Sequence, residues 1–329
     1  MAEFRHQQSA HCESGVVSAL ARHHGVALSE PMSFGLGEAL AFAYLPLLKV
    51  NEMPLISYRM PPRTIIKKLR RKLDLPFRFE TFRSATQGEE RLDQLLESGR
   101  PVGVQTSVFF LPYFPVNMRF HFNGHNLIVY GKDRGDYLVS DPVFETATRC
   151  APRDLTRARF ARGMLAPKGM LYFLDGDAKH VETAPLLRPA IRGTCRTMLQ
   201  PLLPFIGTRG IRLLARRVGA LAHRSDQNEV RRTIGHIVRM QEEIGTGGAG
   251  FRYLYAAFLQ EAAEKLGDER LRLHSLDLTA IGDAWREFAL DAARMSKGRQ
   301  PLQPELLAQR LSDLSQREAT FFRALKKDL

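Results

Sequence analysis

The chain changes character near its middle, and this change constrains its fold more than any other feature. Up to about residue 176, short runs rich in β-branched and aromatic residues alternate with turn residues. Beyond about residue 190 no comparable run occurs, and apolar residues recur with the period of a helix. The segment 175–189, which mixes charges and prolines without a period, separates the two textures. The sequence therefore predicts an α+β domain over residues 1–185 and an all-α domain over 186–329. The expected strands are 101–110, 125–132, 136–143 and 170–176, and the expected helices are 209–224, 228–244, 251–266, 278–295 and 303–327.

Length and composition fit a globular protein of two domains. The 329 residues are 44% apolar and 25% charged, which excludes disorder and low-complexity structure. No stretch approaches the ~18 apolar residues of a membrane span, and the N-terminus lacks the features of a signal peptide. The three cysteines show no CxxC spacing and the histidines no HExxH, so we expect neither disulfides nor a metal site. These features predict a cytoplasmic protein without a membrane span.

The formal net charge is +13, and much of the excess lies between residues 188 and 232. Ten arginines in that stretch face only two acidic residues, Asp226 and Glu229. Apolar residues interrupt the arginines at helical spacing, so one interpretation is the solvated face of amphipathic helices. A second is a docking surface for an acidic protein. Nucleic acid is not expected, because the chain carries no zinc-finger or RNA-binding signature.

The most informative candidate for chemistry is Cys12, which directly precedes the apolar pattern of a helix that Gly25 is placed to end. At the start of a helix, free backbone N–H groups and the helix dipole stabilise a thiolate and lower the pKa of the thiol. Cys12 is therefore a candidate nucleophile. The alternative is a buried cysteine that only fills space.

A candidate base comes from the register of a predicted hairpin. If the turn is Lys132–Arg134 and Gly131 faces Gly135, His125 lies directly opposite Asp141. Directly opposed side chains share a face of the sheet and lie close enough for a hydrogen bond. The spacing thus predicts that Asp141 orients the imidazole of His125. The alternative is a turn histidine and an aspartate that caps an Asp-Pro turn.

A nucleophile on a helix, a base on one strand and its orienting carboxylate on the next predict a papain-like domain with an antiparallel sheet. The residues that flank the three, HC-x2-G (11–15), GHNLIVYG (124–131) and VSDPV (139–143), resemble the cysteine-peptidase-like N-terminal domain of butirosin-biosynthesis protein H and its relatives. Segment 28–46 resembles the same group. Segment 245–263 is similar to the helical domain of unknown function that usually follows it.

The resemblance implies a cysteine-dependent acyltransferase in specialised metabolism. Cys12 would take an acyl or aminoacyl group from the thioester of an acidic acyl-carrier protein, with His125 as base and Asp141 as orienter, and pass it to a small amine acceptor. No cofactor is implied, except the phosphopantetheine that belongs to the carrier. A cysteine hydrolase with the same residues, and a binding module without turnover, remain alternatives. The oligomeric state stays open.

Further site residues are expected around these three. In related cysteine peptidases a Gln six residues before the nucleophile completes the oxyanion hole. His6 occupies that position here, so Gln8 or Gln7 is the expected donor. His11 is expected either to tune Cys12 or to pack at the helix start. The apolar segment 34–46 is expected to wall the substrate pocket or to form a buried helix. The other pocket candidates are Phe34, Arg252 and Tyr253, the last two in a glycine-rich turn between helices.

Overall fold

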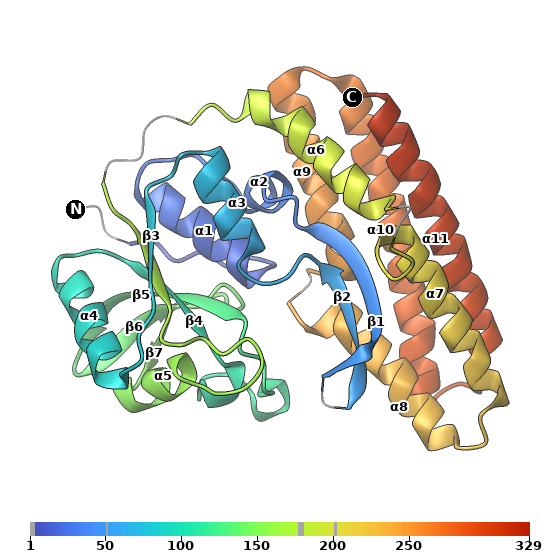
Figure 1. Ribbon diagram of the computed structural model, residues 1–329, viewed down its shortest axis with the longest axis horizontal. Coiled ribbons are helices and arrows are strands. Elements are labelled where there is room, and N and C mark those ends of the chain that lie inside the picture. Colours follow the sequence, from blue (N-terminus) through green and yellow to red (C-terminus); the bar gives the residue numbers. More distant parts are fainter. Residues whose placement is uncertain (1–3, 51, 177–180, 201–202, 246) are drawn as a thin grey trace. The chain divides into compact units, whose positions relative to one another are not determined.

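A computed structural model describes residues 4–50, 52–176, 181–200, 203–245 and 247–329 (Figure 1). The chain forms two compact units, one made of residues 1–33 and 65–182 and the other of residues 34–64 and 183–329. The division at residue 182 falls close to the predicted boundary, although residues 177–180 of the predicted linker lie outside the described residues. Residues 34–64 differ from the prediction, because they belong to the second unit and not to the first.

The first unit is built on a six-stranded antiparallel sheet, which confirms the predicted α+β class. Its strand order is β3-β8-β4-β5-β6-β7. The strands are β3 (Phe77–Glu80), β4 (Val102–Thr106), β5 (His125–Asp133), β6 (Asp136–Ser140), β7 (Thr148–Cys150) and β8 (Leu171–Leu174). Helix α1 (Cys12–His23) packs on β4, β5 and β8. The other helices of the unit are α3 (Thr64–Lys72), α4 (Ala85–Glu97) and α5 (Pro152–Arg159).

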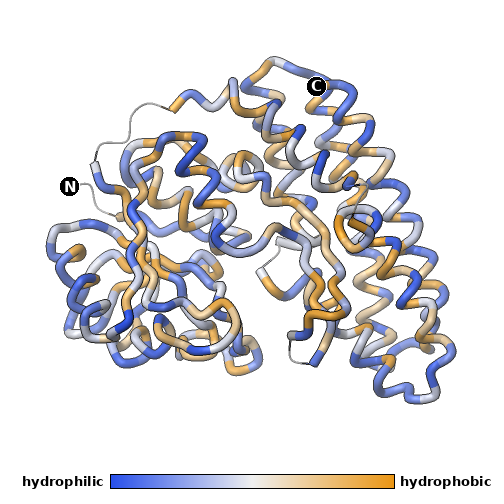
Figure 2. Tube along the Cα trace, viewed as in Figure 1, coloured by the Kyte–Doolittle hydropathy of each residue, from blue (hydrophilic) through white to orange (hydrophobic). Residues whose placement is uncertain are grey.

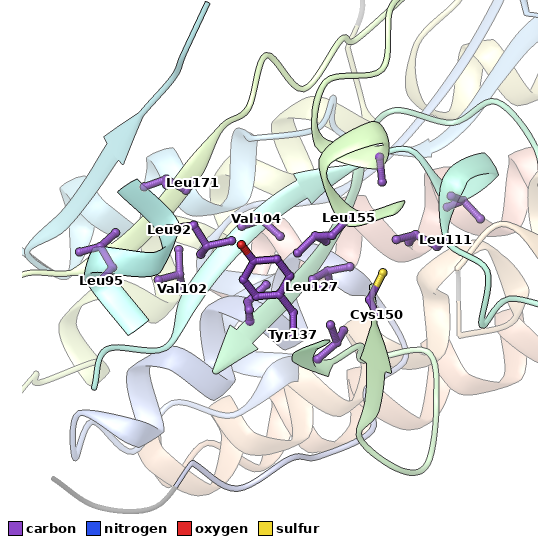
Figure 3. Packing of buried hydrophobic residues seen from close by; sticks show 14 of the residues in the cluster. Leu92, Leu95, Val102, Val104, Leu111, Leu127, Tyr137, Cys150, Leu155 and Leu171 are labelled. Atoms are coloured by element: carbon purple, nitrogen blue, oxygen red, sulfur yellow. The ribbon is translucent and has the colours of Figure 1, made fainter. Parts of the chain in front are cut away.

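One face of this sheet carries a large hydrophobic cluster of the first unit (Figure 3). Val104 of β4 and Leu127 of β5 are fully buried there, together with Leu92 of α4 and Leu155 of α5. Side chains of alternating strand residues supply the sheet's part of this cluster, as the period of a strand requires. The core therefore fixes which residues of β5 and β6 point to which face.

The pairing of β5 with β6 corrects the predicted register. Arg134 and Gly135 both have positive φ, at 51° and 89°, and form a tight two-residue turn. Val129 consequently pairs with Val139, and not with Tyr137 as predicted, and an irregularity follows between Val129 and Gly131. At Ile128 and Val129 the shift from the predicted pairing is two residues, which keeps side chains on their predicted face, whereas between Gly131 and the turn it is three. The predicted apolar face is therefore present, although the turn was predicted wrongly.

The second unit combines a β-hairpin with helices. The hairpin is β1 (Leu40–Val50) and β2 (Met53–Arg59), and it follows the short helix α2 (Glu30–Leu36). The expectation of a buried helix over 34–46 is thus wrong, since most of this segment is strand. The helices are α6 (Ala184–Met198), α7 (Gly207–Gly219), α8 (Gln227–Val238), α9 (Arg252–Leu266), α10 (Glu269–Ser296) and α11 (Pro304–Lys327), with a short helix η3 (Ala220–His223) after α7.

The C-terminal region is helical throughout its described part, as predicted, and α10 starts earlier than expected. Hydrophobic and hydrophilic residues alternate around α10 and α11, which is the pattern of helices that bury one side (Figure 2). The glycine-rich stretch is a turn between helices, as predicted. It packs so closely on β2 that a Cβ at Gly250 would lie 2.2 Å from the ring of Tyr58. Among the described residues, no helix combines the length and apolarity needed to cross a bilayer.

Candidate active site

The fold places Cys12 at the first position of α1, as the sequence predicts. His11 is the N-cap residue, and its Nδ1 accepts a hydrogen bond from the Ser14 backbone N–H at 3.4 Å. Glu30 holds the preceding chain, because its two carboxylate oxygens accept from the backbone N–H groups of Ala10 at 2.9 Å and His11 at 2.7 Å. Cys12 is only 8% exposed. Hydrogen bonds to residues before and after Cys12 therefore hold the start of the helix in place.

His125 and Asp141 lie in direct contact. The Nε2 atom of His125 is 2.7 Å from Oδ2 of Asp141, and both residues are buried. His125 is the first residue of β5, and Asp141 follows the last residue of β6, so the two meet where the strands end. Cys12 hydrogen-bonds to the His125 side chain. The structure thus brings together the three residues that the sequence singles out.

The charge state of His125 follows from these contacts. Burial alone would lower the pKa of His125, but the charge of Asp141, the hydrogen bond to Asp141 and the contact with Cys12 raise it to about 10. The imidazole is therefore protonated at neutral pH and stabilises an anionic neighbour. A cysteine beside an imidazolium has the surroundings of a nucleophilic thiolate.

Two aromatic residues that the sequence did not reveal complete the surroundings of this pair. The Tyr113 hydroxyl donates to Oδ2 of Asp141 at 2.9 Å, and the backbone N–H of Val143 donates to Oδ1 at 3.1 Å. The ring of Phe114 meets the ring of His125 edge-on, with centroids 5.4 Å apart. Asp141 is therefore held by three donors, which fixes the carboxylate that orients His125.

The N-terminal segment fastens α1 to the loop after β6. The Ser9 backbone N–H donates to the Pro142 carbonyl at 2.8 Å. Gly15 allows the approach, because a Cβ there would lie 2.5 Å from the Cβ of Ser9 and 3.2 Å from the Cβ of Pro142. The spacing HC-x2-G thus has a physical reason, since the glycine one turn after Cys12 lets the helix lie against the loop that carries Asp141.

The predicted oxyanion donors lie elsewhere. Gln7 and Gln8 are exposed, and the Gln8 amide donates to the Val143 carbonyl at 3.2 Å. The side-chain amide that lies at the Cys12 sulfur belongs to Asn126, whose Nδ2 is 3.9 Å from Sγ. Asn126 follows His125 directly in the sequence, but strand residues next to one another usually point to opposite faces, so the pattern gave no reason to choose it.

The remaining candidates have packing roles where the structure places them. His11 caps α1, as described above. Phe34 belongs to the second unit, is fully buried and stacks on Phe251 with centroids 5.2 Å apart. Arg252 is also fully buried in that unit, where its guanidinium bonds both oxygens of Glu318. The Tyr253 hydroxyl donates to Asp283 at 2.7 Å.

The protonation of His125 gives a first testable prediction. We expect the His125 ring to be an imidazolium at about pH 9, because its pKa is raised well above the ordinary value near 6.5. In Asp141→Asn the attracting charge is gone while burial remains, so the ring should be neutral at that pH. NMR of ¹⁵N-labelled histidines, titrated from about pH 5 to pH 10.5, measures both states.

His236 serves as the internal reference for this titration. Burial lowers the pKa of His236, and its Nε2 lies 2.9 Å from the Pro54 carbonyl in the second unit, so it should titrate at the same low pH in both proteins. A wild-type His125 that is already neutral at about pH 8 contradicts the ion pair.

Comparisons with known proteins match two successive parts of the chain. Residues 11–142 match the family described as butirosin biosynthesis protein H, N-terminal. Residues 153–325, over half of the chain, match a domain of unknown function, DUF4872. The solved structure of a C39-like peptidase from Bacillus anthracis is similar over 53% of this chain and 96% of that chain, at 11% identity and a TM-score of 0.38. No curated protein matches. The chain thus belongs to the DUF4872 family, and its residues 11–142, ahead of that match, are similar to the N-terminal domain of butirosin biosynthesis protein H.

Proposed function

We propose that the protein is a cysteine-dependent acyltransferase that moves an acyl or aminoacyl group from a carrier-protein thioester to an amine through a thioester on Cys12. The observation that carries the proposal is the chain of contacts from Cys12 to His125 and from His125 to Asp141. The match of residues 11–142 to the N-terminal domain of butirosin biosynthesis protein H supports a biosynthetic acceptor over a peptide substrate.

The first half of the reaction loads the enzyme. The Cys12 thiolate attacks the carbonyl carbon of the donor thioester, a new S–C bond forms, and the electron pair of the carbonyl moves to oxygen. When the carbonyl re-forms, the bond to the carrier sulfur breaks and His125 gives its proton to the departing thiolate. One thioester replaces another of similar energy, so a thiol nucleophile suits this donor.

The second half passes the group on. The amine attacks the carbonyl carbon of acyl-Cys12, and neutral His125 takes the proton that the amine nitrogen loses. The S–C bond to Cys12 then breaks and restores the thiolate beside an imidazolium. The products are an amide and free enzyme, so no cofactor takes part apart from the phosphopantetheine that the carrier brings.

A cysteine hydrolase would use the same residues with water in place of the amine. Incubation with acyl-carrier thioesters, followed by mass spectrometry of the intact protein and analysis of products with and without added amines, separates the two. An adduct on Cys12 that partitions to the amine supports the transferase. An adduct that partitions only to water identifies a hydrolase, and the absence of any adduct with all donors contradicts both.

The carrier protein is proposed to bind the arginine-rich part of the second unit. Within this stretch, Arg188 pairs with Asp268, Arg192 bonds the Leu329 carbonyl and Arg231 donates to the Met295 carbonyl. The exposed ones include Arg217, Arg224 and Arg232, which line a groove of about 440 Å³ between the β1–β2 hairpin and helices α7 and α8.

The lining of this groove suits an acidic partner. Lys49 adds a fourth cation against two acidic residues, Glu52 and Glu229, while Leu214 and Val218 supply an apolar floor. Opposite charges steer a partner during encounter, and the apolar floor adds contact area once it is bound.

A second prediction tests this docking surface. Replacement of Arg217, Arg224 and Arg232 by Ala should lower kcat/KM with a carrier-bound donor by about tenfold at low salt, because charge complementarity raises the rate of association. The same variant should match the wild type at about 1 M salt, where the Debye length is about 3 Å. A short pantetheine thioester, which presents no protein surface, should react equally with both enzymes.

The control variant removes three other exposed arginines, Arg294, Arg317 and Arg323, and so changes the net charge by the same amount. It should leave kcat/KM unchanged with the carrier-bound donor. If both triple variants lose kcat/KM to the same extent, net charge and not the groove governs association, and the proposed docking surface is wrong.

A further inference from the structure

Asn126 places a buried amide at the nucleophile. Its Nδ2 donates toward Sγ of Cys12 at 3.9 Å and to the Gly124 carbonyl at 3.1 Å, and the residue is only 5% exposed. A carbonyl oxygen can only accept, so the bond to Gly124 requires the nitrogen of the amide on this side. The amide therefore presents an N–H donor, and not its oxygen, to the sulfur.

Tyr172 fixes this orientation from the other end of the amide. The Tyr172 hydroxyl donates to Oδ1 of Asn126 at 3.0 Å, and the ring is fully buried on β8. Gly103 on β4 makes room for the ring, since a Cβ there would lie 2.3 Å from a ring carbon of Tyr172. The amide is thus held in place before any substrate arrives, which is the condition for effective electrostatic stabilisation.

Two of the residues that could otherwise serve as donor have other hydrogen-bond partners. His6, at the position where related peptidases have Gln, places Nδ1 2.7 Å from the Ser140 hydroxyl and Nε2 3.0 Å from the Phe144 carbonyl. Gln8 donates to Val143, as described above. Both side chains thus join the N-terminal segment to the loop around Asp141.

We infer that Asn126 is the side-chain donor of the oxyanion hole, a role that rests on the proposed acyl transfer. When the Cys12 sulfur bonds to the carbonyl carbon, the oxygen on that carbon gains an electron pair and lies two bonds from the sulfur. The Asn126 N–H that faces Sγ then donates to this oxyanion. When the tetrahedral adduct collapses, the electron pair returns and the donor sulfur leaves, so Asn126 forms and breaks no covalent bond.

Two reactions of Cys12 distinguish this role from a general effect on the thiol. Acylation by an acyl-pantetheine thioester or by p-nitrophenyl acetate passes through an oxyanion, whereas alkylation by iodoacetamide displaces iodide without one. Asn126→Ala should acylate about 10²- to 10³-fold more slowly while its alkylation rate stays within about threefold of the wild type. Asn126→Asp, which offers no N–H, should lose at least as much acylation.

A second variant tests the same role with Asn126 in place, in case Asn126→Ala does not fold. Tyr172→Phe only frees the amide to turn, so acylation should fall by roughly three- to tenfold with alkylation unchanged. As a matched control, Asn123→Ala removes another buried amide, one that donates to the Arg162 and Met164 carbonyls. It should leave the ratio of the two rates unchanged.

Acylation of Asn126→Ala within about fivefold of the wild type overturns the inference, as does a parallel loss of acylation and alkylation. A different result would reject the proposed function without rejecting the role of Asn126. If the thioester does not acylate the wild-type enzyme but p-nitrophenyl acetate does, carrier-dependent transfer is wrong, and the rates with the ester still measure the contribution of Asn126.

Discussion

Replacement of Cys12 by Ala is expected to abolish the acyl adduct and to lower turnover by about 10⁶-fold, the loss seen when the nucleophile of a cooperating triad is removed. The loss is this large because His125 and Asp141 have no function in the proposed reaction without a sulfur to activate. Intact-protein mass spectrometry with a carrier-bound thioester measures the adduct, and product analysis measures the turnover.

Cys195→Ala provides the matched control, since Cys195 is fully buried on α6 and burial raises the pKa of its thiol to about 12. This variant should form the adduct at the wild-type rate. An adduct that persists in Cys12→Ala, or that disappears in Cys195→Ala, would place the nucleophile elsewhere.

The second large effect concerns the stability of the second unit. Arg252 and Glu318 form a fully buried ion pair with an N···O distance of 2.8 Å, and the Trp285 indole N–H donates to the same Glu318 oxygen at 2.6 Å. Arg252→Met leaves the carboxylate buried without its counter-charge, so the free energy of unfolding should fall by about 3–5 kcal/mol. Trp285 is the single tryptophan of the chain, so its fluorescence during denaturation follows this unit.

The double variant Arg252→Met with Glu318→Leu is the control for this interpretation. It removes both charges and keeps apolar volume, so most of the lost stability should return. If the double variant is as unstable as Arg252→Met, the loss reflects packing and not an unpaired charge. Acylation of Cys12 by p-nitrophenyl acetate should survive in both variants, since every contact described around Cys12 lies within the first unit.

The sequence predicted the three central site residues because local rules determine their placement. A helix start places Cys12, and the alternation of strand side chains places His125 and Asp141 toward one another. The predicted register was nevertheless wrong, because the turn at Arg134 and Gly135 is shorter than expected and an irregularity follows Val129. The contact survived because the irregularity makes the shift two residues at Val129, which preserves faces on the side of His125, and because Asp141 lies beyond the last paired residue, where the chain is free to turn.

The supporting residues could not be predicted in the same way. Tyr113 lies between two short 3-10 helices, η1 (Val108–Phe110) and η2 (Val116–Met118), where no periodic pattern fixes the direction of a side chain. Glu30 holds the segment before Cys12 through the backbone N–H groups of Ala10 and His11, which have no signature in the sequence. Asn126 depends on Tyr172, a residue 46 positions away, and on the space left by Gly103. Contacts of this kind are tertiary, so propensity and spacing do not reveal them.

The assignment of residues 34–64 failed for a related reason. The apolar run from Leu40 reads equally as a buried helix or a strand, since neither is distinguished by periodicity in a fully apolar segment. The neighbouring strand decides that this run is a strand, because β1 pairs with β2 and both pack with the helices of the second unit. Phe42 meets the rings of Tyr58 and Trp285 there, with centroids 5.2 and 6.3 Å apart.

The most direct measurement of the central claim compares the three cysteines within one molecule. Wild-type protein at about pH 7 is treated with limiting iodoacetamide, and peptide mass spectrometry gives the rate of alkylation at each cysteine. Cys150 and Cys195 are the internal references, because burial raises the pKa of each thiol to about 12. Activation by His125 predicts that Cys12 is alkylated at least about 100-fold faster than either, and that Asp141→Asn narrows this difference. Equal rates at all three cysteines would contradict a reactive thiolate at Cys12, and with it the proposed enzyme.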